Sequence, residues 1–204
     1  MGFYNERILP HLIEFAMRNA QLAPYRDRVV SAAAGRVLEI GLGAGENLSR
    51  YGSSVSDLIG LEPSARLAAM ARRAGNHSAV RTTIVEATAE EMPLDTESFD
   101  TVVMTWTLCS IPDPRRALRE IRRVLKLEGR LLFVEHGLAP DERVRRWQHR
   151  LTPLWRRIAG GCHLDREMSS LVANAGFRLE RLTTGYMPGP RPMTFMYEGC
   201  AARG

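Results

Sequence analysis

The sequence predicts a single α/β domain whose central sheet is doubly wound and mainly parallel. Short segments rich in Leu, Ile and Val alternate with segments of helical periodicity along most of the chain. The first apolar segment, 37–40, runs directly into a glycine-rich turn. The last two, 177–184 and 194–201, follow each other without a predicted helix, so they must be antiparallel neighbours. The 204 residues suit one such domain, which we expect to span 1–204.

The composition narrows the class of partner. The net charge is +5, the isoelectric point is near 9.5, and Lys126 is the sole lysine among 28 basic residues. This charge permits attraction to anionic lipids, nucleic acid or acidic substrates. No aromatic RNA-binding motif, zinc knuckle or basic tail accompanies it, so nucleic acid is not the expected partner. Cys109, Cys162 and Cys200 are widely spaced and odd in number, which argues against a disulfide framework or a zinc site and fits a reducing cytoplasm.

The N-terminal segment 5–20 has the periodicity of an amphipathic helix. We expect it to pack on the domain, and a membrane-surface or lid role is the alternative. A short helix over 25–34 then leads to the first strand, so 1–34 should cover the pocket. Residues 1–5 lack a basic segment, and no apolar run reaches the roughly 18 to 20 residues that cross a bilayer. Neither a signal peptide nor a membrane span is therefore expected.

The first strand and its turn read V-L-E-I-G-L-G-A-G over 37–45. Gly41, Gly43 and Gly45 lack a Cβ, so the turn can adopt positive φ and bring backbone N–H groups close to a ligand. A dinucleotide-binding loop would need its third glycine where Glu46 stands, which weakens the pyrophosphate interpretation. We expect 46–51 to begin a helix whose N-terminal dipole points at the ligand.

The second strand, 58–61, ends at Glu62 and Pro63. A carboxylate about 20 residues beyond the glycines occupies the position of the ribose ligand in nucleoside-binding α/β folds. A helix capped by Ser64 and a third, β-branched strand at 82–87 should follow.

The fourth strand, 101–105, is continuously apolar, as expected for a parallel strand that is covered on both faces. It opens into 106–112, which should face the ligand crevice at the carboxyl end of the sheet. A helix over 113–126 and a fifth strand over 130–135, closing on His136, come next. Beyond them we expect an amphipathic helix at 143–158 and a helix at 165–175 capped by Asp165.

Glu39 before the glycines, the G-x-G-x-G turn and Glu62 together resemble the class I S-adenosylmethionine-dependent methyltransferases. T-A-E-E-M-P-L at 88–94 is similar to the stretch that lines the adenine in this family. Many members carry Asp where Thr88 stands, so backbone atoms of Ala89 or Glu90 would have to make the adenine contact.

Further segments resemble particular branches of this family. A-L-R-E-I-R-R-V-L-K at 117–126 is typical of the small-molecule branch. The segments that resemble the methyltransferase-like alkyl-thiol methyltransferases, and more distantly bacterial phosphatidylethanolamine N-methyltransferases, are T-L-C-S-I at 107–111, F-V-E-H-G at 133–137 and G-C-H-L-D-R-E at 161–167.

The resemblance implies a seven-stranded sheet of order 3-2-1-4-5-7-6, with the last strand antiparallel and helices on both faces. It also implies S-adenosylmethionine as methyl donor, S-adenosylhomocysteine as product, and no metal. The expected acceptor is a small molecule, with a thiol or another soft nucleophile favoured. The residues expected to bind the donor are Glu39, Gly41, Leu42, Gly43, Gly45, Asn47, Glu62, Pro63, Thr88, Ala89, Glu90, Thr105, Trp106 and Thr107.

Two histidines are candidates for deprotonating an acceptor. His136 ends the fifth strand on the crevice side, and His163 lies in a glycine-rich connection ahead of Asp165. For each, the alternative is a hydrogen bond that orients its own loop. Cys109 is expected to be a packed strand-end residue, since no basic neighbour in sequence would lower its pKa. Neither histidine has a paired ligand at metal-binding spacing.

The sequence also permits other functions. The Arg-rich helix 143–158 is expected to be an amphipathic cover for the pocket. The alternative is a lid that rests on lipid, which would suit N-methylation of an amine or phospholipid head group. A regulatory protein that binds S-adenosylmethionine without turnover is the alternative of another class. The terminal hairpin disfavours a dehydrogenase. We expect a cytoplasmic protein with peripheral membrane contact as an alternative, and its oligomeric state cannot be read from the sequence.

Overall fold

The structure is a computed structural model that describes residues 11, 17 and 19–204. Most of the helix expected at 5–20 lies outside these residues. The described chain enters through η2 (Ala20–Leu22) and α2 (Ala23–Val30), which confirms a short helix before the first strand.

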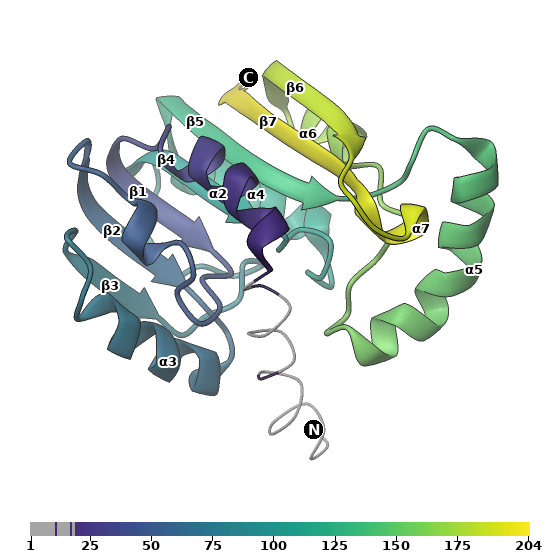
Figure 1. Cartoon of the computed structure of the whole chain (residues 1–204). Coiled ribbons are helices and arrows are strands. Elements are labelled where there is room, and N and C mark those ends of the chain that lie inside the picture. Colours follow the sequence, from purple (N-terminus) through teal and green to yellow (C-terminus); the bar gives the residue numbers. More distant parts are fainter. Residues whose placement is uncertain (1–10, 12–16, 18) are drawn as a thin grey trace.

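The described strands form one sheet of order β3-β2-β1-β4-β5-β7-β6. Strands β1, β2, β3, β4 and β5 pair in parallel, whereas β7 runs antiparallel to both β5 and β6. Figure 1 shows the arrowheads of β1, β2 and β5 at the same end of the sheet. The expected order and its antiparallel strand are therefore confirmed. The strands are β1 (Gly35–Ile40), β2 (Val55–Leu61), β3 (Thr82–Val85), β4 (Phe99–Thr105), β5 (Leu125–His136), β6 (Phe177–Tyr186) and β7 (Phe195–Arg203).

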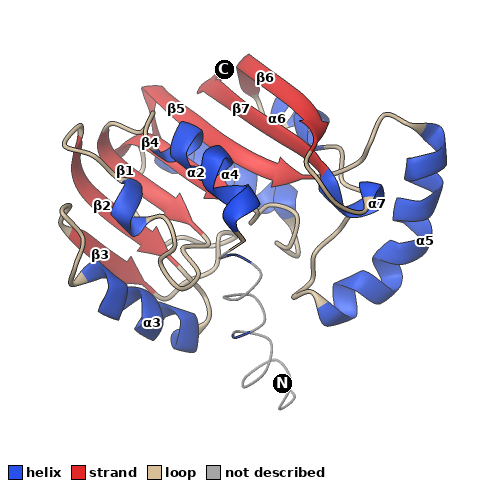
Figure 2. Ribbon diagram, viewed as in Figure 1, coloured by secondary structure: helices blue, strands red, loops and turns tan. Residues whose placement is uncertain are grey.

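Helices cover both faces of the sheet (Figure 2). The residue period of two sends alternate strand side chains to opposite faces, so Leu38 packs with one layer and its neighbour Val37 with the other. The first layer contains α4 (Pro114–Val124) and α6 (Met168–Asn174), and the second contains α2 and α3 (Ala65–Gly75).

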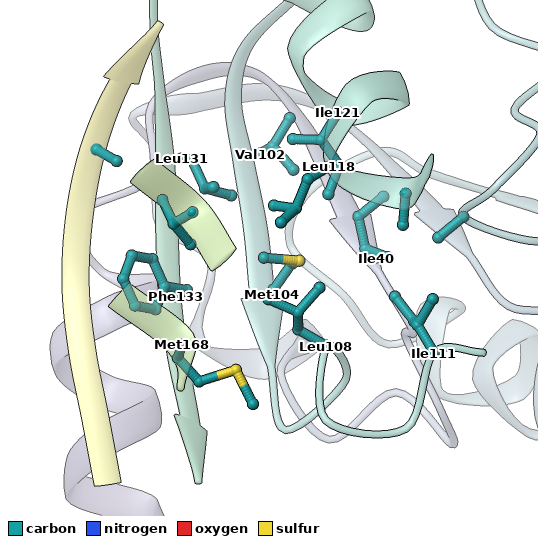
Figure 3. Packing of buried hydrophobic residues seen from close by; sticks show 14 of the residues in the cluster. Ile40, Val102, Met104, Leu108, Ile111, Leu118, Ile121, Leu131, Phe133 and Met168 are labelled. Atoms are coloured by element: carbon teal, nitrogen blue, oxygen red, sulfur yellow. The ribbon is translucent and has the colours of Figure 1, made fainter. Parts of the chain in front are cut away.

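The larger apolar cluster lies between β1, β4, β5 and α4 (Figure 3). Leu118 and Ile121 of α4 are fully buried against Val102 and Met104 of β4. Asp113 caps this helix by accepting from the Arg116 backbone N–H at 3.0 Å, and Pro114 suits its first turn. This packing fixes the carboxyl ends of β4 and β5, where the candidate site lies.

Two local predictions were wrong. Residues 46–51 form only the single 3-10 turn η3 (Leu48–Arg50), because the chain is already extended at Tyr51 and must reach β2 within a few residues. No α-helical dipole therefore points from this segment at a ligand. Helix α6 begins at Met168 and is capped by Glu167, whose carboxylate accepts from the Ser170 N–H at 2.7 Å.

The remaining helices lie towards the C-terminus. Helix α5 (Glu142–Ile158) packs against the one-turn helix α7 (Arg191–Thr194), which interrupts the hairpin between β6 and β7. Within the part of the chain that the structure describes, no helix is long and apolar enough to cross a membrane.

Candidate active site

A cavity of about 850 Å³ opens at the carboxyl ends of β1, β2, β4 and β5. The segments after these strands form its walls, together with part of α5 and the hairpin methionines Met187, Met193 and Met196. Its size suits a nucleoside-containing ligand together with a small second molecule. The crevice lies where an open α/β sheet is expected to bind ligands.

The glycine turn presents backbone to this cavity. The Gly41 and Leu42 N–H groups donate to the Leu61 carbonyl at 2.8 and 3.1 Å, which ties the turn to β2. Gly43 has φ of +60°, and a Cβ added there would meet no atom within 4 Å. A ligand can therefore approach the Gly43 backbone closely. A Cβ at Gly45 would instead meet Leu48 at 2.8 Å, so Gly45 serves packing and does not line the cavity.

Glu62 supports the same turn from β2. Its Oε2 accepts from the Gly43 N–H at 2.9 Å, and its Oε1 accepts from the Ser64 N–H at 2.9 Å. Each oxygen keeps a lone pair for a ligand hydroxyl, because a carboxylate has about four acceptor sites. Burial raises the pKa of Glu62, and the two backbone donors oppose that shift. The geometry suits a carboxylate that accepts hydrogen bonds from two adjacent hydroxyl groups.

Glu39 lies beneath the turn in a buried polar network. Its carboxylate accepts from the Tyr51 hydroxyl at 2.8 Å and from the Asn47 amide at 2.7 Å. The Asn47 side-chain oxygen accepts from Arg26 at 2.7 Å, and Asn47 itself does not line the cavity. Burial raises the pKa of Glu39 to about 7, although hydrogen bonds from Tyr51 and Asn47 and the Arg26 charge oppose the shift.

This raised pKa predicts a pH-dependent contribution to stability. The unfolded Glu39 titrates near 4.5 and the folded one near 7, so the stabilisation is full below pH 4.5 and is lost as pH rises through 7. Glu39→Gln cannot ionise, so the wild-type free energy of unfolding should fall by about 2–3 kcal/mol more than that of the variant between pH 5 and pH 8. Urea unfolding at both pH values measures this difference. Parallel pH dependence in the two proteins would contradict the assignment.

The segment after β4 carries an unusual backbone conformation. Trp106 has φ of 52°, a region that bulky residues rarely adopt outside functional sites. Its N–H donates to the Val134 carbonyl at 2.8 Å, and the Arg26 guanidinium lies 4.9 Å from its ring centroid. Thr105, Trp106 and Thr107 thereby line the cavity beside the glycine turn.

Glu135 fixes the loop that follows. Its fully buried carboxylate accepts from three consecutive backbone N–H groups, at 2.7 Å from Thr107, 2.8 Å from Leu108 and 3.3 Å from Cys109. Burial and the nearby Cys109 raise the pKa of Glu135, and the first two of these donors oppose the shift. Glu135 thus positions the Cys109 backbone. The sequence shows Glu135 only as the neighbour of His136 and does not indicate this role.

Cys109, His136 and Cys162 meet at one end of the cavity, and we call them the Cys–His–Cys cluster. Their Sγ, Nε2 and Sγ atoms all lie within 4.8 Å of one another, and His136 Nε2 is 2.9 Å from Cys162 Sγ. The hydrogen bond with Cys162 and the His136 charge hold the pKa of Cys109 well below its usual range. Burial disfavours the imidazolium, but the Cys109 charge outweighs it and raises the pKa of His136 to about 9. Cys109 is buried just after β4, as expected, but the fold brings to it the basic neighbour, His136, that is absent from the adjacent sequence.

Comparisons with known proteins agree with this geometry. A family model described as a methyltransferase domain matches residues 38–133. The chain carries a class I methyltransferase domain. A Thermotoga maritima structure, described as an S-adenosylmethionine-dependent methyltransferase and possible histamine N-methyltransferase, is 26% identical. It aligns with a TM-score of 0.68 over 99% of this chain and 96% of its own.

Curated relatives of this methyltransferase domain include thiol S-methyltransferases. Those named TMT1B are 36% identical over 145 residues in Rattus norvegicus and 35% identical over 154 residues in Homo sapiens. The matches cover 69% and 72% of this chain but 59% and 63% of the relatives, so the chain spans about three fifths of their length. A phosphatidylethanolamine N-methyltransferase of Cereibacter sphaeroides is 32% identical over 109 residues, or 52% of this chain and 53% of its own.

The donor half of the methyltransferase domain fits S-adenosylmethionine, the cofactor that its family implies. The open space at Gly43 suits a close ligand, and Glu62 offers carboxylate lone pairs where ribose hydroxyls would lie. All the residues predicted to bind the donor line the cavity, apart from Gly45 and Asn47. Those that line it are Glu39, Gly41, Leu42, Gly43, Glu62, Pro63, Thr88, Ala89, Glu90, Thr105, Trp106 and Thr107.

Removing the Glu62 carboxylate should weaken donor binding. Glu62→Ala deletes charge-assisted hydrogen bonds worth roughly 1.5–3 kcal/mol each, so the Kd for S-adenosylmethionine should rise at least about tenfold. Glu91→Ala is the matched control, because that carboxylate lies outside the cavity lining and is 84% exposed. Isothermal titration calorimetry measures both values. An unchanged Kd for Glu62→Ala would remove Glu62 from the donor site.

The two candidate histidines occupy different places in the methyltransferase domain. His136 lines the cavity, whereas His163 does not. His163 Nδ1 lies 3.6 Å from Asp165, and its backbone N–H donates to the Cys109 carbonyl at 2.8 Å. Burial lowers the pKa of His163, as do the Arg166 and Arg156 charges. These contacts favour the alternative in which His163 orients its loop.

Some cavity residues were not indicated by the sequence motifs, whereas Trp155 lies on the helix that was expected to cover the pocket. Arg26 belongs to α2, and its guanidinium is buried between Asn47 and Trp106. Trp155 comes from α5, which Gln148 anchors by accepting from the Ala139 N–H and donating to two carbonyls. Met187 and Met193 lie between β6 and β7, Met196 lies in β7, and their flexible apolar side chains were the one available signal.

Proposed function

We propose that the protein transfers a methyl group from S-adenosylmethionine to the sulfur of a small thiol. One observation carries this proposal, namely a single cavity that joins a nucleoside-binding half to an end lined by Cys109, His136 and Cys162. The names of its thiol S-methyltransferase relatives support the same acceptor class.

The two halves of the cavity bind the two reactants. The bound donor supplies a methyl group on a sulfonium sulfur, which a nucleophile displaces in line. Glu62 binds the ribose of the nucleoside portion and the Gly43 turn faces the methionine portion, while Thr105 and Trp106 line the same cavity. Holding the two reactants in line lowers the barrier by about 7–11 kcal/mol in well-oriented systems.

The acceptor end suits a sulfur nucleophile. Met187, Met193 and Ile111 give it an apolar wall that excludes water from the reacting atoms. A free thiol with a pKa near 8.5 is already a few per cent thiolate at neutral pH, so modest help in deprotonation suffices. The Cys–His–Cys cluster is positioned to give that help.

A screen with isotopically labelled S-adenosylmethionine tests the proposal. Small alkyl and aryl thiols, amines, phenols and phospholipids would each be incubated with the protein, and labelled product and S-adenosylhomocysteine would be measured. We expect turnover with thiols to exceed that with the other classes by at least about tenfold. Preferred labelling of an amine or phenol would overturn the thiol assignment, and binding without S-adenosylhomocysteine release would indicate a regulatory protein.

The second candidate function is N-methylation of an amine or a phospholipid head group. Helix α5 favours it, because Trp147 and Leu154 are exposed there among arginines and Arg150 lies 5.9 Å from the Trp147 ring centroid. Such a face suits an anionic membrane surface. Co-sedimentation with liposomes that depends on Trp147, together with labelled lipid, would support this candidate over a thiol acceptor.

The alternatives of other classes have their own tests. A thermal-shift comparison of S-adenosylmethionine with NAD separates a methyltransferase from a dehydrogenase, and only the first should raise the Tm. We also propose a cytoplasmic location, with peripheral membrane contact as the alternative. All three cysteines are unpaired in the structure, which fits a reducing compartment.

A further inference from the structure

We propose that Cys109, His136 and Cys162 form a three-ligand site for a thiophilic divalent cation such as Zn²⁺, with its fourth coordination position open to the cavity. The cluster comes from three separate segments, the loop after β4, the end of β5 and the connection after α5. Sequence spacing disfavours a metal site only for ligands that lie close together in the chain. Here Cys109 and His136 are 27 residues apart, and His136 and Cys162 are 26 residues apart. The fold alone brings them together.

The geometry suits a tetrahedral ion. Zn–S bonds of 2.3 Å and Zn–N bonds near 2.0 Å place ligand atoms about 3.4–3.8 Å apart. The three ligand atoms here lie within 4.8 Å of one another, so side-chain shifts of about an ångström would seat the ion. Two thiolates and one imidazole form the ligand set of catalytic zinc sites that keep an open position.

The surroundings hold these ligands in place. The Trp155 indole N–H donates to Cys162 Sγ at 3.2 Å, and Ser110 Oγ lies 3.5 Å from Cys109 Sγ. Hydrogen bonds of this kind orient metal-bound thiolates. The His163 N–H donates to the Cys109 carbonyl, which joins the two cysteine-bearing loops, while Glu135 holds the first of them from below. Both cysteine-bearing loops are therefore tied down before any ion binds, whereas His136 Nδ1 is buried without a hydrogen-bond partner among the described residues.

The open position faces the cavity, because all three residues line it. An acceptor thiol would lose its proton to solvent as it enters the cavity and bind the cation as its thiolate, so the cation would supply the deprotonation assigned above to a base. This last step rests on the proposed function, whereas metal binding by the cluster does not. Cys200 lies outside the cavity lining and provides a matched control.

Metal content tests the site directly. The reduced protein would be loaded with Zn²⁺, dialysed and analysed by inductively coupled plasma mass spectrometry. We expect about one zinc per chain in the wild type and in Cys200→Ser, and less than about a tenth of that in Cys109→Ser and Cys162→Ser. Circular dichroism melting of each variant checks its fold. Wild-type protein that retains no zinc while all three thiols titrate would overturn the proposal.

Cobalt gives a second readout that needs no variant. Co²⁺ in this ligand set should show sulfur-to-cobalt charge-transfer absorption and visible bands of tetrahedral intensity, which EDTA should abolish. Adding the best thiol from the screen should shift these bands if it occupies the fourth position. Thiol methylation by metal-free protein would overturn the site's role but leave the proposed function intact. A Co²⁺ spectrum without any thiol turnover would retain the site and contradict the function.

Discussion

Replacing Gly43 with valine is expected to abolish binding of S-adenosylmethionine while the domain stays folded. The space beside the Gly43 Cα is open to the cavity, so a side chain there would occupy the volume that the methionine portion of the donor needs. Loss of measurable binding by calorimetry corresponds to a Kd increase of more than about a hundredfold, or roughly 2.7 kcal/mol. Tight binding by Gly43→Val would mean that the ligand lies elsewhere.

The positive φ of Gly43 requires a second variant. Valine is strained at a φ of +60°, so part of its effect could come from a distorted turn. Asparagine tolerates this conformation several-fold better, and Gly43→Asn should also block the donor while keeping the wild-type Tm. Gly52→Val is the matched control, because Gly52 has equally open space but does not line the cavity. Its donor affinity should match that of the wild type.

The donor half could be predicted because it is encoded locally. The strand, its glycine turn and Glu62 lie within about 25 residues, and the rule that ligands bind at carboxyl strand ends places them together. Gly45 and Asn47, which were predicted to bind the donor, lie outside the cavity lining for a reason that only packing reveals. Gly45 makes room for Leu48, and Asn47 bonds to Glu39 and Thr105 beneath the turn.

The acceptor half of the cavity could not be predicted from the sequence in the same way. Cys109 and Cys162 lie 53 residues apart in sequence, and their meeting depends on how the loop after α5 packs against the loop after β4. Glu135 shows most clearly that tertiary partners cannot be predicted from neighbouring residues. His136 lines the cavity, whereas the adjacent Glu135 carboxylate accepts from three backbone N–H groups. Strand alternation predicts opposite faces for these two residues but not the partners that each one finds.

Removing the imidazole of His136 should lower turnover by about 10²–10⁴-fold while changing the Kd for S-adenosylmethionine less than about twofold. His136 lies at the end of β5 with the Cys–His–Cys cluster, away from Glu62, so its loss should affect the acceptor and spare donor binding. His149→Ala is the matched control, since that ring is 53% exposed on α5 and outside the cavity lining.

Single-turnover rates with a saturating donor, compared with donor affinities from calorimetry, separate the effect on turnover from the effect on donor binding. Partial recovery of His136→Ala turnover towards pH 9, where a thiol ionises unaided, would assign deprotonation to the Cys109–His136 pair, because the raised pKa of His136 leaves its own imidazole protonated at pH 7. No recovery, together with loss of bound zinc, would assign His136 the role of metal ligand. Wild-type turnover at pH 7 would contradict both roles and leave deprotonation to bulk water.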